Sequence, residues 1–145
     1  MPARDPAGRA DGRVPFDYAV VRVVPHVERG ERMNAGVVLH CRAHDFLAAR
    51  IALDEARLLA LAPDVDLAVV RRHLLAIERV CEGAPEAGAI GALPRAERFG
   101  WLVSPRSTML QLGRPHVGLC HAPADALVAL VDKLVATPRG PKRRD

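Results

Sequence analysis

The chain has 145 residues and a mass of 15.7 kDa, which is the size of one domain. Half of the residues are hydrophobic, enough for a core, and 26% are charged, as in a soluble protein. No apolar run approaches the ~18 residues of a membrane helix, and the first residues, Met-Pro-Ala-Arg-Asp, contain no apolar export signal. We therefore expect no transmembrane helix and a cytoplasmic location.

The net charge of +4 comes from the two ends of the chain. Residues 1–15 contribute +1 (three Arg, two Asp) and residues 139–145 contribute +3 (four cations, one Asp), which leaves 14 basic and 14 acidic side chains in residues 16–138. Nucleic-acid binding is driven by cations that neutralise phosphates, so the composition argues against it for the folded core. We expect a disordered leader at 1–15, one domain at 16–138 and a disordered basic tail at 139–145.

Three strands are predicted in the first third of the domain. Residues 17–24 form a nearly continuous β-branched run ended by Pro25, which is typical of a central strand. A charged loop leads to a second strand at 33–41, at a spacing typical of an antiparallel hairpin, and Gly36 predicts a bulge or a close backbone approach. Residues 46–51 complete a three-stranded meander.

Two helices follow the meander. Asp54 is placed to cap a short helix that ends at Leu61, and Asp64 is placed to cap a longer one that runs to about Glu82. His73 adjoins the apolar side of the longer helix and is interpreted as a packed or half-exposed side chain, not a ligand. Apolar residues at steps of three and four predict one buried stripe: Leu67, Val70, Leu74, Ile77 and Cys81.

The remaining half contains a loop at 83–91, strands at 108–112 and 116–120, and a last helix between Pro123 and Pro138. This order of elements predicts an α+β fold. We expect an antiparallel sheet, made of the meander plus a carboxyl-terminal strand pair, with the helices packed mainly on one face.

The three cysteines, Cys41, Cys81 and Cys120, have no CxxC spacing. We interpret them as buried free thiols of a protein in a reducing compartment. A zinc site with neighbouring histidines is the alternative, but the ligand spacing of structural zinc is missing, so we expect no metal and no cofactor.

Polar groups are concentrated in the window 98–111. The chain has two Ser, two Thr, one Asn and one Gln, and four of these six residues lie between positions 104 and 111. The only Trp, one of the three Phe and two Arg lie in or beside the same stretch. The candidate site for an anion or a partner therefore consists of Arg98, Trp101, Arg106, Ser107, Thr108 and His116.

Two interpretations of this window stay open. In the first, the arginine forks and the hydroxyls bind an anion, and His116 joins them if the strands at 108–112 and 116–120 pair. In the second, residues 104–107 form a turn whose hydroxyls bond their own backbone. Phe99 and Trp101 point to one side if the segment is extended, and an exposed Trp101 would mark an interface.

An enzyme is the rival class of function. A small hydrolase or nuclease would use Ser107 or Thr108 with His116 as base, and Glu97 is the nearest carboxylate in sequence to orient that base. No GxSxG elbow is present, and the acidic residues occur singly at loops and helix caps. Ser107 and Thr108 are also candidate acceptors of a phosphate from a kinase.

Four blocks of the sequence resemble a bacterial family known as domain of unknown function 3037: Tyr18–Pro25, Asn34–Leu39, Arg98–Trp101 with Pro105–Thr108, and His116–Leu119. The resemblance covers about residues 16–136 and implies no activity and no catalytic residues. Members are similar to small proteins found beside HipA-like kinases, which implies that the protein is a partner or a substrate of such a kinase. We therefore expect a non-enzymatic interaction or regulatory module.

Overall fold

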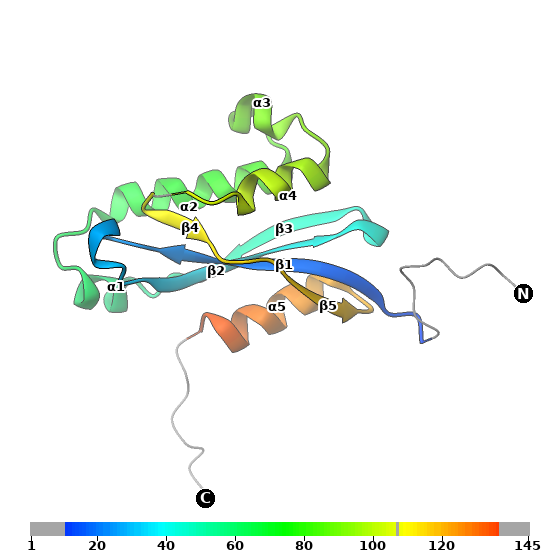
Figure 1. Ribbon diagram of the computed structural model, residues 1–145, viewed down its shortest axis with the longest axis horizontal. Helices are drawn as coiled ribbons and strands as arrows, with labels where there is room; N and C mark the ends of the chain where they lie inside the picture. The colour runs from blue at the N-terminus through cyan, green and yellow to red at the C-terminus, as the bar shows by residue number, and fades with distance from the viewer. Residues whose placement is uncertain (1–10, 107, 137–145) are drawn as a thin grey trace, which may run out of the picture.

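The computed structural model describes residues 11–106 and 108–136. Its centre is an antiparallel sheet with helices on both faces (Figure 1). The strands are β1 (Val14–Val23), β2 (Met33–Cys41), β3 (Phe46–Ile51), β4 (Leu110–Leu112) and β5 (His116–Cys120). The helices are α1 (Glu55–Leu61), α2 (Leu67–Glu82), α3 (Gly88–Gly91), α4 (Arg95–Val103) and α5 (Pro123–Leu134), and short 3-10 turns occur at Val27–Arg29, Arg42–His44 and Pro85–Ala87. The predicted α+β class is confirmed.

The three-stranded meander is confirmed, with β2 between β1 and β3. The β1–β2 register slips between Val21 and Arg22, because Val21 pairs with Gly36 and Arg22 with Asn34. Gly36 therefore lies beside a bulge. It also faces the neighbouring strand so closely that a Cβ atom would lie 2.7 Å from the carbonyl oxygen of Arg50.

The two carboxyl-terminal strands do not pair with each other. Both pair with β1, β4 along residues 21–23 and β5 along residues 14–18. They form one interrupted edge strand, in which Gly113, Arg114 and Pro115 bulge out between the two paired segments. β1 begins at Val14, inside the stretch predicted as leader, because Val14 pairs with Cys120. Residues 1–10 and 139–145 lie outside the described part of the chain.

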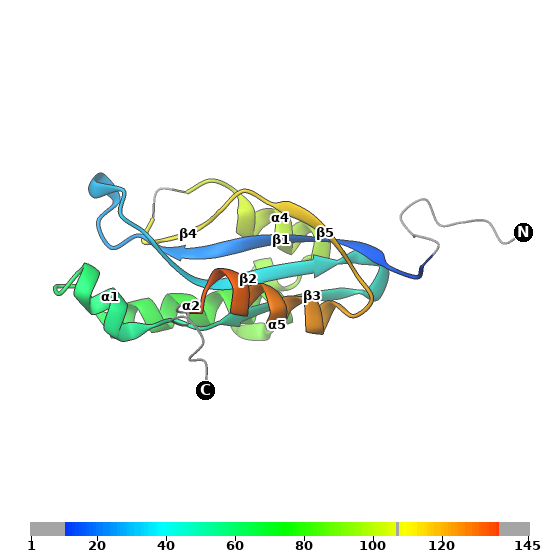
Figure 2. The same ribbon diagram turned by 90° about the horizontal axis from the view of Figure 1, so that it is seen from below.

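Helices cover the two faces of the sheet unequally (Figures 1 and 2). Most of them, including α2 and α4, lie on one face, as predicted, whereas α5 lies on the other, across β2 and β3. Alternate residues of β2 therefore enter two separate cores, Val38 toward α2 and both Val37 and Leu39 toward α5. Burial on both faces explains why β1 and β2 are nearly continuous apolar runs.

The helix caps correct one detail of the sequence analysis. Asp54 caps α1 as predicted, and its carboxylate accepts from the amide of Arg57. Asp66 rather than Asp64 caps α2, and Asp64 instead lies 3.1 Å from Nε2 of His26. The predicted loop at 83–91 is partly helical, since it contains α3.

The three cysteines are buried and free, as predicted. Burial raises the pKa of the Cys81 thiol to about 12, so almost none of it is thiolate at neutral pH. Within the described ranges, no helix has both the length and the apolar character needed to cross a bilayer.

The contact at Gly36 gives a prediction about stability. Gly36→Ala is expected to lower the free energy of unfolding by about 1–3 kcal/mol, because the carbonyl of Arg50 that the new methyl group meets belongs to the backbone and must move. Gly100→Ala is the matched control, since a Cβ there meets no atom within 4 Å on helix α4, and it should stabilise by about 0.5–1 kcal/mol. Urea denaturation measures both. Equal effects of the two variants would contradict the close approach at Gly36.

Candidate functional site

The window 98–103 is helical rather than extended, and this separates its two aromatic side chains. Successive residues of a helix point in different directions, so Phe99 and Trp101 do not share a side. Phe99 is buried and stacks on His40, with ring centroids 5.6 Å apart. Burial lowers the pKa of His40, which favours the neutral form of its ring. Trp101 lies on the surface, 38% exposed.

Arg98 does not belong to the surface predicted for it. The side chain is 7% exposed, and Nη1 donates to the carbonyl oxygens of Val80 (2.9 Å) and Cys81 (2.7 Å) at the end of α2. Nε donates to the carbonyl of Leu93 (2.8 Å). Gly83, with a left-handed φ of 70°, ends α2 and leaves room for the guanidinium, since a Cβ would lie 3.1 Å from Nη1. Arg98 therefore holds α4 against the carboxyl end of α2.

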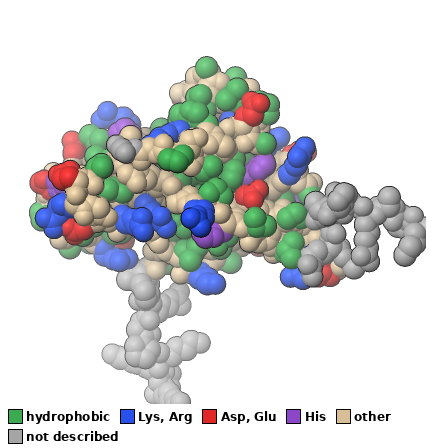
Figure 3. Space-filling model, viewed as in Figure 1, with side chains coloured by type: hydrophobic (Ala, Val, Ile, Leu, Met, Phe, Trp, Pro, Cys, Tyr) green, Lys and Arg blue, Asp and Glu red, His purple; other side chains and the backbone are tan. Residues whose placement is uncertain are grey.

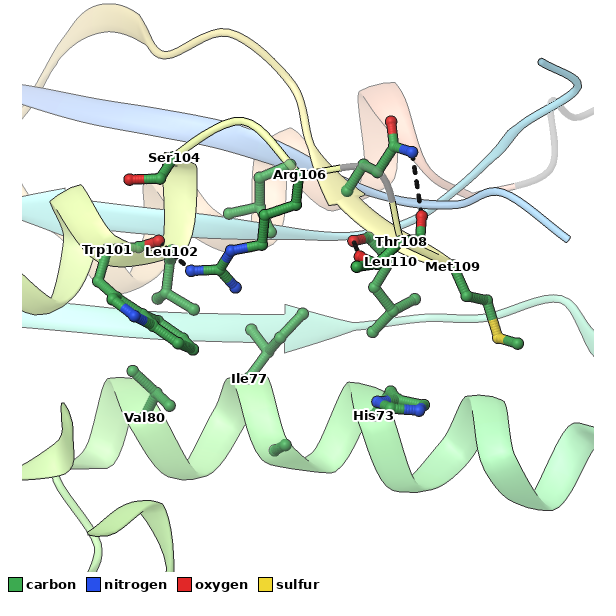
Figure 4. A pocket seen from close by; sticks show the side chains of 13 residues that line it. His73, Ile77, Val80, Trp101, Leu102, Ser104, Arg106, Thr108, Met109 and Leu110 are labelled. Atoms are coloured by element: carbon green, nitrogen blue, oxygen red, sulfur yellow. Dashed lines mark hydrogen bonds between the residues drawn. The ribbon is translucent and has the colours of Figure 1, made fainter. Parts of the chain in front are cut away.

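A hollow of about 350 Å³ opens between α2 and the segment 101–112 (Figure 4). We call it the first hollow. Its walls are mainly apolar and its rim is polar, and thirteen residues line it: His73, Ala76, Ile77, Val80, Trp101, Leu102, Ser104, Arg106, Thr108, Met109, Leu110, Gln111 and Leu112. A cavity of this size with apolar walls and a few polar groups is typical of a ligand or partner site.

Arg106 and Trp101 form one end of the first hollow. The guanidinium carbon of Arg106 lies 3.8 Å from the centre of the indole ring, a cation–π contact, and Nη2 donates to the carbonyl oxygen of Trp101. Figure 4 shows the two side chains stacked above α2. These contacts fix the cation at the mouth of the hollow, where water still reaches it.

The hydroxyl groups of the window bond to their own backbone. Ser104 donates to the carbonyl of Gly100 (2.9 Å), and Thr108 donates to that of Leu110 (2.6 Å). Gln111 donates to the carbonyl of Thr108 (3.0 Å), which closes a compact turn (Figure 4). Of the two interpretations left open, the turn describes Ser104 and Thr108. Ser107 lies outside the described residues.

Thr108 and His116 are not brought together. The chain beside Thr108 meets β1 at Val24, whose amide donates to the carbonyl of Met109, whereas His116 pairs with Tyr18. Six residues of a strand span roughly 20 Å. His116 also stacks on Tyr18, 5.4 Å between ring centroids, and Tyr18 packs toward α5, away from the first hollow. The pairing on which the anion pocket with His116 depended does not occur.

One wall of the first hollow, which α2 supplies, was not predicted from the sequence. His73, Ala76, Ile77 and Val80 line the first hollow from one side of this helix. The apolar stripe identified Ile77 as buried, but it carried no sign that the stripe reaches past the core to the surface. Among the described residues, no group of three His, Cys, Asp or Glu side chains is placed to hold a metal ion.

Arg98 provides a test of how the site is supported. Arg98→Met keeps much of the length of the side chain but removes every donor, so the carbonyl oxygens of Val80, Cys81 and Leu93 each lose the hydrogen bond from Arg98. We expect a loss of stability on the order of 3 kcal/mol in urea denaturation. Arg95→Met, at an exposed position of the same helix, should change it by less than about 0.5 kcal/mol. Similar small effects of the two variants would show that Arg98 does not hold α4 in place.

Comparison with known proteins gives a family and nothing narrower. Neither the curated proteins nor the solved structures contain a match to this chain. The family model "Protein of unknown function (DUF3037)" matches residues 18–135, from β1 through α5. This range includes both walls of the first hollow and most of the chain. The protein therefore belongs to the DUF3037 family.

Proposed function

We propose that the protein is a non-enzymatic interaction module that holds an apolar segment of a partner protein in the first hollow. The observation that carries this proposal is an open hollow of about 350 Å³ with apolar walls and the exposed Trp101 at its mouth. Exposed tryptophan and arginine at the edge of an apolar pocket are typical of binding hot spots. Of the two hydroxyl groups suggested for a hydrolase, that of Thr108 donates to the backbone carbonyl of Leu110.

The charge of the rim indicates what kind of segment fits. The thirteen lining residues include one Arg and one His but no Asp or Glu. Arg106 already donates one hydrogen bond to the carbonyl of Trp101, and the other N–H groups of its guanidinium can donate to an acceptor on a bound partner. The matching segment carries an apolar anchor for the hollow and a carboxylate next to it for Arg106.

The family resemblance supports a particular partner to test first. Members are similar to proteins found beside HipA-like kinases, so a kinase of this class is the first full-length protein to examine. The alternative of a nucleic-acid partner has less support, because residues 16–138 carry no net charge.

Selection from a random peptide library on the immobilised full-length protein tests the proposal. We expect enriched peptides to combine a large apolar residue with Asp or Glu. Trp101 is the only tryptophan and lies at the mouth of the hollow, so its fluorescence should report titration of each peptide. Ala76→Phe should weaken binding at least tenfold, since a phenyl ring at this exposed position of α2 fills the hollow from its wall.

Ala129→Phe on helix α5 is the matched control, because it adds the same ring at an exposed position on the other face of the sheet. It should leave peptide affinity unchanged. Peptides that bind the Ala76→Phe protein as tightly as the natural one would exclude the first hollow as their site. The same pair of variants, tested against a purified HipA-like kinase, decides whether that kinase uses this surface.

A further inference from the structure

A second hollow lies on the outer side of the sheet edge, next to the first. Its volume is about 500 Å³, and it separates the segment 103–106 from the bulge between β4 and β5. Eight residues line this second hollow: Val103, Pro105, Arg106, Gln111, Leu112, Gly113, Arg114 and Pro115. Two of them are arginines, one is a glutamine and none is acidic. Arg106 also lines the first hollow, so the two hollows share one wall.

A third arginine reaches the same bulge from β1. Arg22 pairs with Gln111 across the β1–β4 ladder. Its guanidinium lies flat against Gly113, since a Cβ on that glycine would be 2.9 Å from Nη1 and 3.2 Å from Nη2. Any larger residue at position 113 would push the guanidinium away. The glycine thus sets the position of the Arg22 guanidinium at the bulge.

Among residues 11–106 and 108–136, no ion pair joins Arg22, Arg106 or Arg114 to a carboxylate. Burial lowers the pKa of Arg22, and the like charge of Arg32 lowers it further. Figure 3 shows Lys and Arg side chains gathered in the middle of the face where β4 and β5 meet. Like charges held together without a partner are unfavourable until an anion joins them.

We propose that Arg22 and Arg114, at Gly113, together with Arg106 on the facing wall of the second hollow, bind the phosphate group of a phosphate monoester. Arginine presents planar pairs of donors that match phosphate oxygens. A dianion also compensates several cations at once, whereas a carboxylate offers a single charge. Nε2 of Gln111, on the same wall, donates one of its two hydrogens to the carbonyl of Thr108, and the second can donate to a phosphate.

This site is separate from the interaction proposed for the first hollow. The two have Arg106 in common, but Arg22 and Arg114 do not line the first hollow. Variants of these two arginines therefore test the phosphate site alone, and Ala76→Phe tests the first hollow alone. Either site can fail without the other.

The experiment is an NMR titration of the ¹⁵N-labelled full-length protein with sodium phosphate, against sodium chloride at the same ionic strength. We expect the backbone amides of residues 111–114 to shift and saturate with phosphate only. Arg114→Gln and Arg22→Gln should each weaken phosphate binding roughly ten- to a hundredfold. Arg57→Gln, at an exposed position on α1, should leave it unchanged.

Gly113→Ala separates geometry from charge. It removes no cation but displaces the Arg22 guanidinium, so it should weaken phosphate binding by at least several-fold. Arg114 is exposed, so Arg114→Gln remains a valid test even if the half-buried Arg22 proves necessary for folding. Titrations with a phosphoserine peptide and with a nucleoside monophosphate distinguish the source of the phosphate by which binds more tightly.

Three outcomes would overturn the proposal. One is equal response of residues 111–114 to phosphate and chloride. Another is equal weakening by Arg57→Gln and Arg114→Gln, which would indicate diffuse charge attraction. The third is a wild-type affinity for phosphate in both single variants, Gly113→Ala and Arg114→Gln.

Discussion

The candidate surface depends on one buried cation. Arg98 ties α4 to α2 by donating to carbonyl oxygens at the end of α2, where the helix dipole is negative. The attachment fixes the start of the segment that leads to Arg106 and β4. Trp101, one turn further along α4, is consequently held on the outside, beside the wall of α2. A guanidinium that the sequence suggested for ligand binding instead supports the site from within.

A second constraint is the sharing of β1 between two short strands. β4 and β5 both pair with the same edge of β1. Their registers against β1 differ by one residue, so the chain must bulge between them. The bulge contains Pro115 and the exposed Arg114, which also discourage pairing with another sheet at this edge. The edge is thereby kept from pairing with another sheet. Both hollows lie along it.

Features that depend on a local sequence pattern were predicted correctly, whereas features that depend on contacts between distant segments were not. The meander follows from β-branched runs with a period-two alternation between two cores, and Asp54 caps its helix through a bond three residues away. Helix α4 was missed because Gly100 and two aromatic residues disfavour helix locally, and it is the tertiary bond from Arg98 that holds it. The first hollow needed α2 and β4 side by side, which no single stretch of sequence contains.

The distribution of charge over the surface could likewise not be predicted from the sequence. The core is neutral by composition, and this was sound evidence against broad attraction to polyanions. Yet neutrality of the whole does not mean neutrality of each surface. Several carboxylates are committed elsewhere, in the pairs Arg71–Glu55, Arg79–Glu82 and Arg29–Glu31. In the part of the chain that the structure describes, the ion pairs form on other elements, and none joins the arginines at Gly113 to a carboxylate. To bind one small anion, a protein needs a local excess of positive charge at the site, and its overall net charge can be zero.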